Sequence, residues 1–313
     1  MNEPPLVSVV IITYNQKIFL RECIESILEQ DYENIEIVVA DDASTDGTQE
    51  MLKEYALQHY NKFNLVFAEK NQGITQNSNA AFFACKGKYV AMLGGDDLLL
   101  HGKIRKQVDF LETHKDYVLC GSYTKLIDKD GKEIGVKKDF KNKIDKKYVL
   151  SELIESGNYL VPVVSYMFRR DAAPREGFDL RLPVASDSLF MCHVASKGKI
   201  YILKETLTAY RVHNSYAKKI GYIDDSLVSL ALCNFFFPEC YFKTKKALSR
   251  TYYRHAKRII LEETGNICKA KHYLKMSINE SLNIISIIIL ILLSLNLKKL
   301  IIKLYHGFDT LGS

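Results

Sequence analysis

Two aspartates end the segment Gly94-Gly95-Asp96-Asp97, which directly follows the apolar run Tyr89 to Leu93. That run is typical of a buried strand, so the two carboxylates should stand where the strand ends, after a sharp turn at the glycines. Adjacent carboxylates in a sheltered place are costly unless a cation neutralises them. Hard ions such as Mg²⁺ bind through one or two carboxylates together with substrate phosphates, so the segment predicts a metal and diphosphate site. A helix N-cap ahead of Leu98 is the alternative.

A second acidic loop, Asp41 to Thr48, follows the apolar run Ile35 to Ala40. Its first two carboxylates, on Asp41 and Asp42, could accept hydrogen bonds from the N–H of a nucleobase or from ribose hydroxyls. Helix capping and turn formation are the alternative. Tyr14 ends a further apolar run and offers a ring on which a base could stack. The polar positions that we expect to bind a phosphate-bearing donor at these strand ends are Thr13, Tyr14, Asn15, Asp41, Asp42, Asn71, Gly73 and Asp96.

Two further segments carry residues suited to catalysis or anion binding. Asp187 stands at the expected start of an apolar helix, where an acid could be a general base or simply a helix cap. In the expected loop after Tyr210, Arg211 could bind a diphosphate and His213 could be a third metal ligand. Structural roles are the alternative for both loop residues.

The elements that must position these side chains alternate between strand and helix patterns. Between the expected strands, apolar residues recur at helical spacing, which indicates βαβαβ organisation and a largely parallel sheet. Ligands of such sheets bind at the carboxyl ends of the strands. The expected strands of this region are Val7 to Thr13, Ile35 to Ala40, Leu65 to Ala68 and Tyr89 to Leu93.

Beyond this region the pattern loosens into short strands and helices, and from about residue 222 it is helical throughout. We therefore expect a domain at residues 1–220 that binds the donor and catalyses the reaction, and a helical C-terminal region at 221–313. The expected features between them are a helix over Gly102 to Thr113, a turn at Asp130-Gly131, a helix near Asp145 to Glu155, a strand over Val163 to Phe168 and a helix from about Ser186.

Composition narrows the class of protein. The chain has 313 residues, a net charge of +6, and 47% hydrophobic residues, which indicates a folded globular protein and does not favour nucleic acid as the partner. Seven scattered cysteines without C-x-x-C spacing predict neither a disulfide framework nor a zinc site. The start of the chain does not read as a signal peptide, and P-loop, dinucleotide-binding, zincin and α/β-hydrolase motifs are missing from the sequence.

With these residues in view, the chain resembles the family 2 glycosyltransferases of the GT-A fold over about residues 6 to 215. The resemblance implies a Rossmann-like, mostly parallel central sheet flanked by helices, with the helical region as a C-terminal extension. The segments that match the family in order and spacing are Val7 to Asn15, Asp41 to Thr48, Asn71 to Gly73 and Gly95 to Asp97.

The resemblance also implies roles for single residues. Tyr14 and Asp42 would contact the base, Asp96 would approach the ribose, and Asp97 would bind Mn²⁺ or Mg²⁺, with Asp96 beside it. Asp187 matches the catalytic base of an inverting transfer. The family's metal motif is usually written Asp-x-Asp, and many members carry Glu-Asp where this chain has Ser-Asp, so the sequence departs from the pattern at both places.

The C-terminal third has two features of its own. Seven basic residues and no acidic one lie between Lys243 and Arg258, at spacings that predict one positive helix face, either simply solvated or directed at an anionic membrane surface. The apolar stretch Leu282 to Leu297 is shorter than a membrane-spanning helix. We expect an interfacial helix there, with a buried helix that joins copies of the chain into a homo-oligomer as the alternative.

Together these patterns predict a metal-dependent glycosyltransferase that moves a sugar from a nucleotide-diphosphate donor, of which UDP is the expected nucleotide. The expected acceptor is a glycan or lipid-linked glycan in the biosynthesis of cell-surface polysaccharide. The expected location is the cytoplasm, at the inner face of the cytoplasmic membrane. A nucleotidyltransferase and a non-catalytic protein that binds nucleotide sugars are the alternatives.

Overall fold

The computed structural model of the protein describes residues 3–138, 149–157, 160–212, 222–261, 266–298 and 300–302. The chain divides into two compact units, Met1–Asp225 and Ser226–Ser313. The expected domain boundary at 220–221 lies outside the described residues. The roles that we assigned to the two regions remain predictions.

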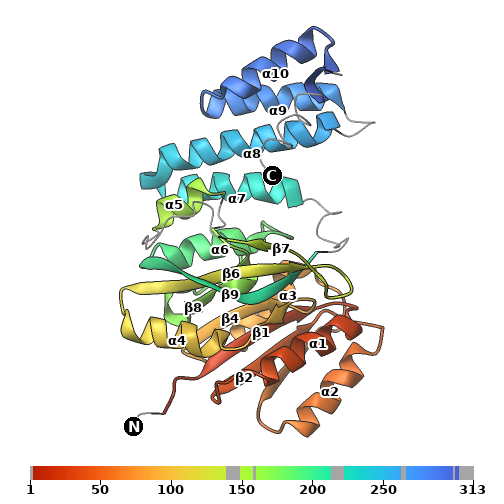
Figure 1. Ribbon diagram of the computed structural model, residues 1–313, viewed down its shortest axis with the longest axis vertical. Coiled ribbons are helices and arrows are strands. Elements are labelled where there is room, and N and C mark those ends of the chain that lie inside the picture. Colours follow the sequence, from red (N-terminus) through yellow and green to blue (C-terminus); the bar gives the residue numbers. More distant parts are fainter. Residues whose placement is uncertain are drawn as a thin grey trace. The chain divides into compact units, whose positions relative to one another are not determined.

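The first unit is built on a mixed sheet whose first half is parallel. Its strands β1 (Val7–Thr13), β2 (Ile35–Asp41), β3 (Phe63–Phe67) and β4 (Tyr89–Gly94) lie in the order β3-β2-β1-β4 (Figure 1). All three pairings are parallel, and β1 and β2 are buried along almost their whole length, as their runs of β-branched residues predicted. The expected α/β fold class is confirmed.

The register of the parallel strands decides where the polar residues stand. Thr13 of β1 pairs with Asp41 of β2, and Ile12 pairs with Gly94 of β4. Because these three strands are parallel and end at the same level, the residues that follow them lie along one edge of the sheet. This edge is the one at which the sequence predicted a ligand.

The second half of the sheet differs from the prediction. β8 pairs antiparallel with both β4 and β6, whereas β6 and β9 are parallel, and the sheet continues in the order β4-β8-β6-β9-β5. We expected short strands, but β6 and β9 are long, and their register shifts at several positions interrupt the alternation of apolar and polar residues by which a strand is recognised. The expected strand over 163–168 was partly wrong, because a 3₁₀ turn, η1 (Val163–Ser165), precedes β8. The strands of this half are β5 (Leu98–Leu99), β6 (Tyr117–Ile127), β7 (Glu133–Lys137), which pairs with β6, β8 (Met167–Arg169) and β9 (Lys199–Arg211).

Helices cover both faces of the sheet (Figure 1). One core joins the strands to α1 (Lys17–Leu28), α2 (Thr48–Gln58) and α4 (Lys103–Thr113). On the other face, α3 (Ile74–Phe83) and α6 (Ser186–Ala195) meet through a group of phenyl rings, in which Phe82, Phe178 and Phe190 pack together with Phe168 of β8. The expected helices from about Gly102 and Ser186 are therefore confirmed. Of the helix expected near 145–155, the described part is α5 (Leu150–Glu155).

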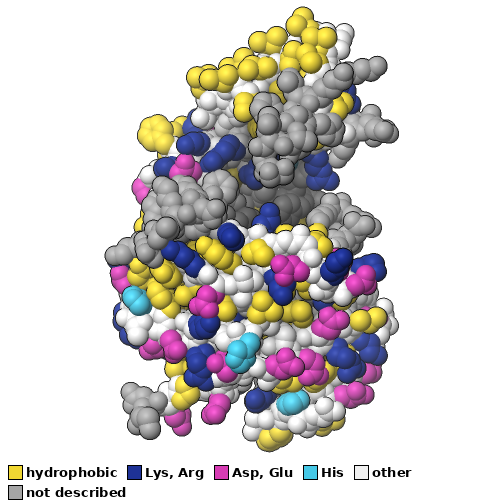
Figure 2. Space-filling model, viewed as in Figure 1, with side chains coloured by type: hydrophobic (Ala, Val, Ile, Leu, Met, Phe, Trp, Pro, Cys, Tyr) yellow, Lys and Arg dark blue, Asp and Glu magenta, His cyan; other side chains and the backbone are white. Residues whose placement is uncertain are grey.

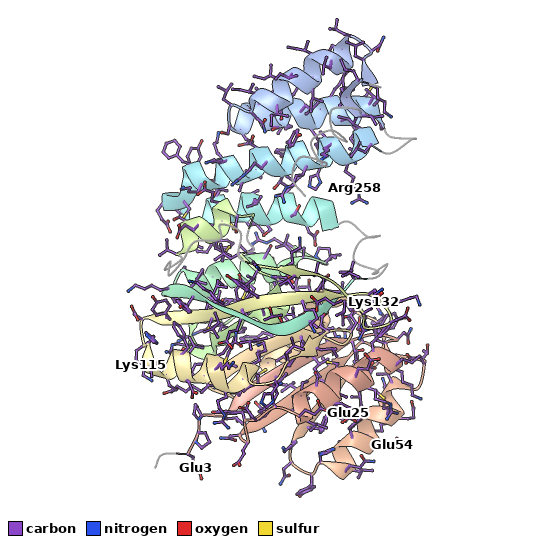
Figure 3. The ribbon with its side chains drawn as sticks, in the orientation of Figure 1. Glu3, Glu25, Glu54, Lys115, Lys132 and Arg258 are labelled. Carbon is purple, nitrogen blue, oxygen red and sulfur yellow. The ribbon has the colours of Figure 1, made fainter. Side chains whose placement is uncertain are left out.

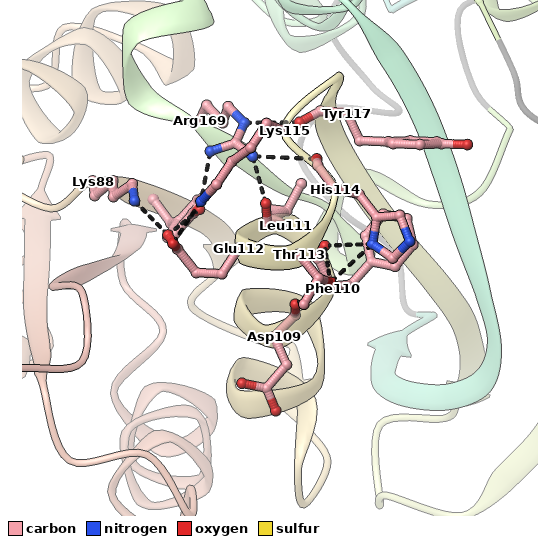
Figure 4. Close-up of polar contacts among 11 residues, drawn as sticks. Lys88, Asp109, Phe110, Leu111, Glu112, Thr113, His114, Lys115, Tyr117 and Arg169 are labelled. Carbon is pink, nitrogen blue, oxygen red and sulfur yellow. Dashed lines mark hydrogen bonds and ion pairs between the residues drawn. The ribbon is translucent and has the colours of Figure 1, made fainter. Parts of the chain in front are cut away.

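A buried arginine fastens α4 to the sheet (Figure 4). The Arg169 guanidinium donates to the carbonyl oxygens of Leu111 and His114 at the C-terminal end of α4, to the Tyr117 carbonyl and to the Tyr89 hydroxyl. The Leu111 carbonyl lies in the last turn of α4, which has no intrahelical donor for it, whereas the His114 carbonyl also accepts from Tyr117 N–H. The network fixes β4, β6 and β8 against α4, and so holds the strand that leads to the acidic turn.

The second unit is helical. Its helices are α7 (Tyr222–Phe236), which starts in the last residues of the first unit, η4 (Pro238–Cys240), α8 (Tyr241–Leu261), α9 (Ile267–Glu280) and α10 (Ile284–Ser294). Helices α8, α9 and α10 share a small apolar core. Hydroxyl groups also join them, because Ser249 donates to the Ser277 carbonyl and Ser277 bonds to Ser286. Within the described residues, none of the helices combines the length and the apolar character needed to cross a bilayer.

We predict a pH dependence of stability from one buried lysine in the first unit. Lys103 is fully buried at the start of α4, where its ammonium donates to Gln107 at 2.7 Å, and burial lowers its pKa from 10.5 to about 7. Between these two values the unfolded chain binds more protons than the folded one, so stability should rise with pH by roughly 1.4 kcal/mol per unit. Lys103→Met should remove this slope and stabilise the protein at pH 7.

Urea unfolding of both proteins at several pH values between 7 and 10 measures this effect. The difference between wild type and Lys103→Met isolates the lysine from the tyrosines and cysteines that titrate in the same range. Identical slopes for the two proteins would show that Lys103 keeps its ordinary pKa.

Candidate functional site

Four loops form the candidate site, each following one strand of the parallel half of the sheet. They are residues 14–16 after β1, 42–47 after β2, 68–73 after β3 and 95–97 after β4. Backbone hydrogen bonds tie them to the strand ends, since Asp42 N–H donates to the Thr13 carbonyl and Gly95 N–H to the Ile12 carbonyl. The loops are thus parts of one rim.

The loops after β1 and β2 are joined by three hydrogen bonds. Asn15 donates from its backbone to the Ser44 hydroxyl, its side-chain oxygen accepts from Thr45 N–H at 2.8 Å, and Asp46 accepts from Lys17 N–H. Asn15 has a φ of 53°, a left-handed conformation that asparagine tolerates well. Its carboxamide oxygen is therefore used to hold the loop, and its predicted contact with a donor remains untested. The neighbouring Tyr14 is 42% exposed, so its ring is open to solvent.

Asp42 fastens the loop after β3 to the same rim. Its two carboxylate oxygens accept from Gln72 N–H at 2.7 Å and from Gly73 N–H at 2.9 Å. Gly73 has a φ of 89°, a conformation that suits glycine, and it starts α3. Each carboxylate oxygen has a further lone pair, so Asp42 keeps the capacity to accept a hydrogen bond from a ligand. Asn71 is exposed beside it.

Asp41 has a different environment from its neighbour. It is fully buried, and one of its oxygens accepts from Ser44 N–H and from the Gln49 side chain, while the other finds no partner among the described residues. Asp46 caps α2 by accepting from the Thr48 N–H and hydroxyl. For Asp46 the capping alternative holds. Asp41 and Asp42 are both buried, and for Asp41 a direct contact with a donor stays a prediction.

The turn after β4 has glycines because it is crowded. A Cβ on Gly94 would lie 2.8 Å from an Asp96 oxygen and 3.1 Å from an Asp97 oxygen, and one on Gly95 would lie 3.0 Å from the Thr13 hydroxyl. Neither glycine has a positive φ, so the reason for their presence is space and not the backbone flexibility that we expected. Both carboxylates therefore lie against the same point of the backbone.

Two neighbouring carboxylates concentrate negative charge on this turn. Burial, and then the charge of Asp96, raises the pKa of Asp97 well above its usual range, although the backbone N–H groups of Arg211 and Gly94 and the Arg211 charge oppose this shift. Two hard oxygen donors on one turn suit Mg²⁺ or Mn²⁺, with water and diphosphate oxygens as the other ligands. Across the described residues no three His, Cys, Asp or Glu side chains gather as metal ligands. The third predicted ligand, His213, lies outside the described residues.

Arg211, the last residue of β9, holds the acidic turn in place. Its side chain is buried and donates to the Asp96 carbonyl at 2.9 Å, to the carboxylate of Glu22 on α1 at 2.5 Å, and to the carbonyls of Asp128 and Lys129. Its backbone N–H donates to Asp97 at 2.9 Å. Direct contact with a diphosphate, which we predicted, is untested, and these bonds favour a positioning role.

Asp187 comes to the same rim through contacts of its helix. Ser186, just before it, is buried and bonds to the Thr75 hydroxyl at 2.9 Å, and Thr75 lies two residues after Gly73 in the first turn of α3. The N-termini of α3 and α6 therefore meet. Asp187 is half-buried, and one oxygen accepts from Ser188 N–H. Its role as a base stays a prediction, although the contacts of its helix link it to the loop that binds Asp42.

Sequence reasoning missed several residues that hold this rim together. Asn77 of α3 donates to the carbonyls of Ala40 and Thr13, and Asp225 accepts from the backbone of the two residues before Ser186. The sequence offers no signal for these long-range bonds, because a polar residue inside an expected helix is normally solvated. The missed residues are Glu22, Gln72, Thr75, Asn77 and Asp225.

Comparison with known proteins gives a consistent picture. The family model of Glycosyl transferase family 2 matches residues 8–173, more than half of the chain. EpsE of Bacillus subtilis, which is named a glycosyltransferase, is 39% identical over 131 residues, or 42% of this chain. The match spans about half, 47%, of that relative's own length.

Two solved structures are similar in fold. TarS 1–349 of S. aureus in complex with UDP has a TM-score of 0.65 and 19% identity over 88% of this chain and 80% of that one. The mannosyltransferase PcManGT of Pyrobaculum calidifontis, in complex with GDP-Man and Mn²⁺, has a TM-score of 0.64 and 19% identity over 99% of this chain and 84% of that one. At 19% identity these two structures support the fold alone, which is the GT-A fold.

We predict that Asp97 lowers the stability of the protein without metal. Its raised pKa means that folding favours the neutral carboxyl, so stability is lost as the pH rises from the usual pKa of aspartate through the raised one. Asp97→Asn keeps an oxygen that can accept from Arg211 N–H and removes the buried charge. The variant should therefore melt at a higher temperature than wild type at pH 7 in EDTA, and should lose the stabilisation that Mn²⁺ and a nucleotide diphosphate give.

Thermal unfolding by calorimetry, with and without UDP and Mn²⁺, measures both effects. Asp171→Asn is the matched control, because Asp171 is an exposed carboxylate away from the rim. A variant that is less stable than wild type in EDTA, or that responds equally to Mn²⁺ and UDP, would contradict the prediction.

Proposed function

The chain belongs to Glycosyl transferase family 2, and on this premise we propose that it transfers a sugar, with inversion, from a UDP-sugar to an acceptor hydroxyl. The observation that carries the proposal is the rim itself. The turn of Asp97 and the loop of Asp42 both donate backbone hydrogen bonds to the end of β1. Asp42 in turn binds the residues that precede α3, and α3 bonds to the helix of Asp187, so three acids far apart in the sequence belong to linked segments.

Binding of the donor would use both sides of this rim. Tyr14, with its exposed ring, would stack on the base, and Asp42 would accept a hydrogen bond from the base through a lone pair that Gln72 and Gly73 do not use. Asp96 would approach the ribose. The likeness to a fold that is known with UDP bound supports this choice of nucleotide.

A divalent cation, Mn²⁺ or Mg²⁺, would be held by Asp97, with Asp96 beside it. The residues fit such an ion, since two carboxylate oxygens crowd around Gly94 and the pKa of Asp97 is raised. When bound, the cation would neutralise charge on the departing diphosphate. Arg211 would keep the turn in the geometry that the ion needs, through its bonds to Asp97, Asp96 and Glu22.

Asp187 would act as the general base. Its carboxylate would take the proton of the acceptor hydroxyl while the acceptor oxygen forms its bond to the anomeric carbon. On the opposite side of that carbon, the bond to the diphosphate oxygen would break, and the nucleoside diphosphate would leave. Asp187 lies in the first turn of α6, where the helix dipole favours a negative charge.

The acceptor in this proposal is a growing cell-surface polysaccharide or a lipid-linked glycan. Such acceptors place the reaction in the cytoplasm beside the inner face of the membrane. The likeness to glycosyltransferases supports the class of reaction, and the sequence of the second unit supports the location. Attachment to the membrane in this proposal is peripheral.

The proposal predicts that Asp187→Asn separates binding from transfer. Asparagine keeps the shape of the side chain and cannot take a proton, so the transfer rate should fall about 10²–10⁴-fold while the dissociation constant of the UDP-sugar stays within a factor of about two. Donor binding is measured by calorimetric titration in Mn²⁺. Transfer, or slow hydrolysis of the donor when no acceptor is known, is measured by release of UDP.

Asp179→Asn serves as the control on the same segment, because Asp179 pairs with Arg181 on the surface. An unchanged rate in Asp187→Asn would remove its assignment as the base. Binding of UDP-sugars to the wild type without any release of UDP would instead favour a non-catalytic protein that binds nucleotide sugars.

A further inference from the structure

Helix α10 carries an apolar face that the described residues of the second unit leave uncovered. Its inner face, with Ile289 and Leu293, is buried against α8 and α9. Its outer face consists of residues spaced four, three and four apart, so they form one stripe along the helix. These residues and their exposures are Ile284 (65%), Ile288 (49%), Ile291 (54%) and Leu295 (62%).

The apolar surface extends beyond the stripe. Ile285 is 54% exposed, and Leu282, just before the helix, is 78% exposed. In Figure 2 hydrophobic side chains form a continuous row at the end of the second unit where α10 lies. No charged residue occurs between Glu280 and Lys298. A row of this size in contact with water is unusual for a surface that has no partner.

The geometry of the helix decides how it could meet a membrane. With 11 residues, α10 is about 16 Å long, roughly half the thickness of the hydrocarbon core of a bilayer. It is therefore too short to cross. A helix with one buried face and one exposed apolar face can instead lie flat in the interface, with its outer side chains among the acyl chains.

Charge is distributed unequally between the two units. Residues 226–313 contain 13 lysines and arginines against 5 acidic residues, a net charge of +8, whereas residues 1–225 have a net charge of −2. On α8, Arg254, Lys257 and Arg258 line a hollow of about 370 Å³, and in Figure 3 Arg258 projects from the side of α8 that faces away from α9 and α10. The net positive charge of the protein thus comes from the unit that carries the apolar face.

We propose that the outer face of α10 docks on an anionic lipid bilayer. The net charge of the second unit attracts it to anionic headgroups, and the apolar stripe of α10 then enters the interface. Charge favours this partner over a second copy of the chain, because a dimer through α10 would bring two units of +8 close together. Docking through α10 would explain the membrane location in the proposed function. It could occur whether or not the protein transfers a sugar.

Flotation with lipid vesicles tests the docking on the full chain without donor or metal. Vesicles of phosphatidylcholine with an equal amount of phosphatidylglycerol should bind the wild type, and vesicles of phosphatidylcholine alone should bind it far less. The double variant Ile288→Asn with Ile291→Asn should bind the anionic vesicles at least about tenfold less. The control Leu57→Asn with Ile134→Asn, which removes two exposed aliphatic side chains of the first unit, should bind like wild type.

A fluorescent reporter tests the docking independently of the double variant. The chain has no tryptophan, so Ile291→Trp places a single indole on the outer face of α10. Its emission should shift to shorter wavelength with anionic vesicles and be quenched by brominated acyl chains. Leu57→Trp, on α2, should show neither change. An unshifted Ile291→Trp spectrum, or equal binding of the double variant, would overturn the proposal.

Two controls separate this inference from its competitors. A stable dimer in light scattering that the double variant converts to monomer would assign the face to a second copy and overturn lipid docking. Thermal stabilisation by UDP and Mn²⁺, measured on the same variants, reports the first unit alone. If that stabilisation persists while flotation fails, only the docking is wrong, and the reverse result would contradict the proposed function.

Discussion

Asp97 is buried beside a second carboxylate, and the candidate site depends on how the fold keeps it there. Like charges at short range raise the free energy of the folded state, and burial adds to that cost. Arg211 offsets part of it, because its backbone binds Asp97 and its side chain binds the Asp96 carbonyl and α1. In the proposed function a cation would offset the rest of the cost, so the same arrangement that reduces stability without a ligand would give the site its affinity for one.

In the loops around this turn, too, some carboxylates hold the backbone in place and others are proposed to bind the ligand. Asp42 and Asp41 are adjacent, yet Asp42 holds a neighbouring loop with capacity to spare, whereas Asp41 is enclosed by its own loop. The Ser186 hydroxyl is bonded to Thr75. Of the two adjacent residues Ser186 and Asp187, only Asp187 carries a carboxylate. Asp42 and Asp97 are each held by backbone N–H groups of another segment of the chain.

The sequence predicted most of the parallel half of the sheet, and predicted less of the antiparallel half. Short runs of mainly β-branched residues such as Val7 to Ile12 favour a buried strand, and the bounds of these strands were predicted within one or two residues. The long β6 and β9 strands contain register shifts and polar residues. Neither the two-residue repeat of a strand nor the 3.6-residue repeat of a helix is therefore clear in their sequences. For the site, Arg211 shows what the sequence could not predict. Its residue type and position predicted anion binding. Its partners Glu22 and Asp97 lie far from it in the sequence, and only the fold brings them together.

A crystal structure of the full chain with UDP and Mn²⁺, with data collected at the manganese absorption edge, tests the central claim most directly. The account predicts an anomalous peak about 2.0–2.3 Å from an Asp97 oxygen and from diphosphate oxygens, with the base between Tyr14 and Asp42. It also predicts that Arg211 keeps its bonds to the acidic turn. A metal ion and diphosphate bound away from Asp97, or a nucleotide outside the rim formed by the four loops, would contradict it.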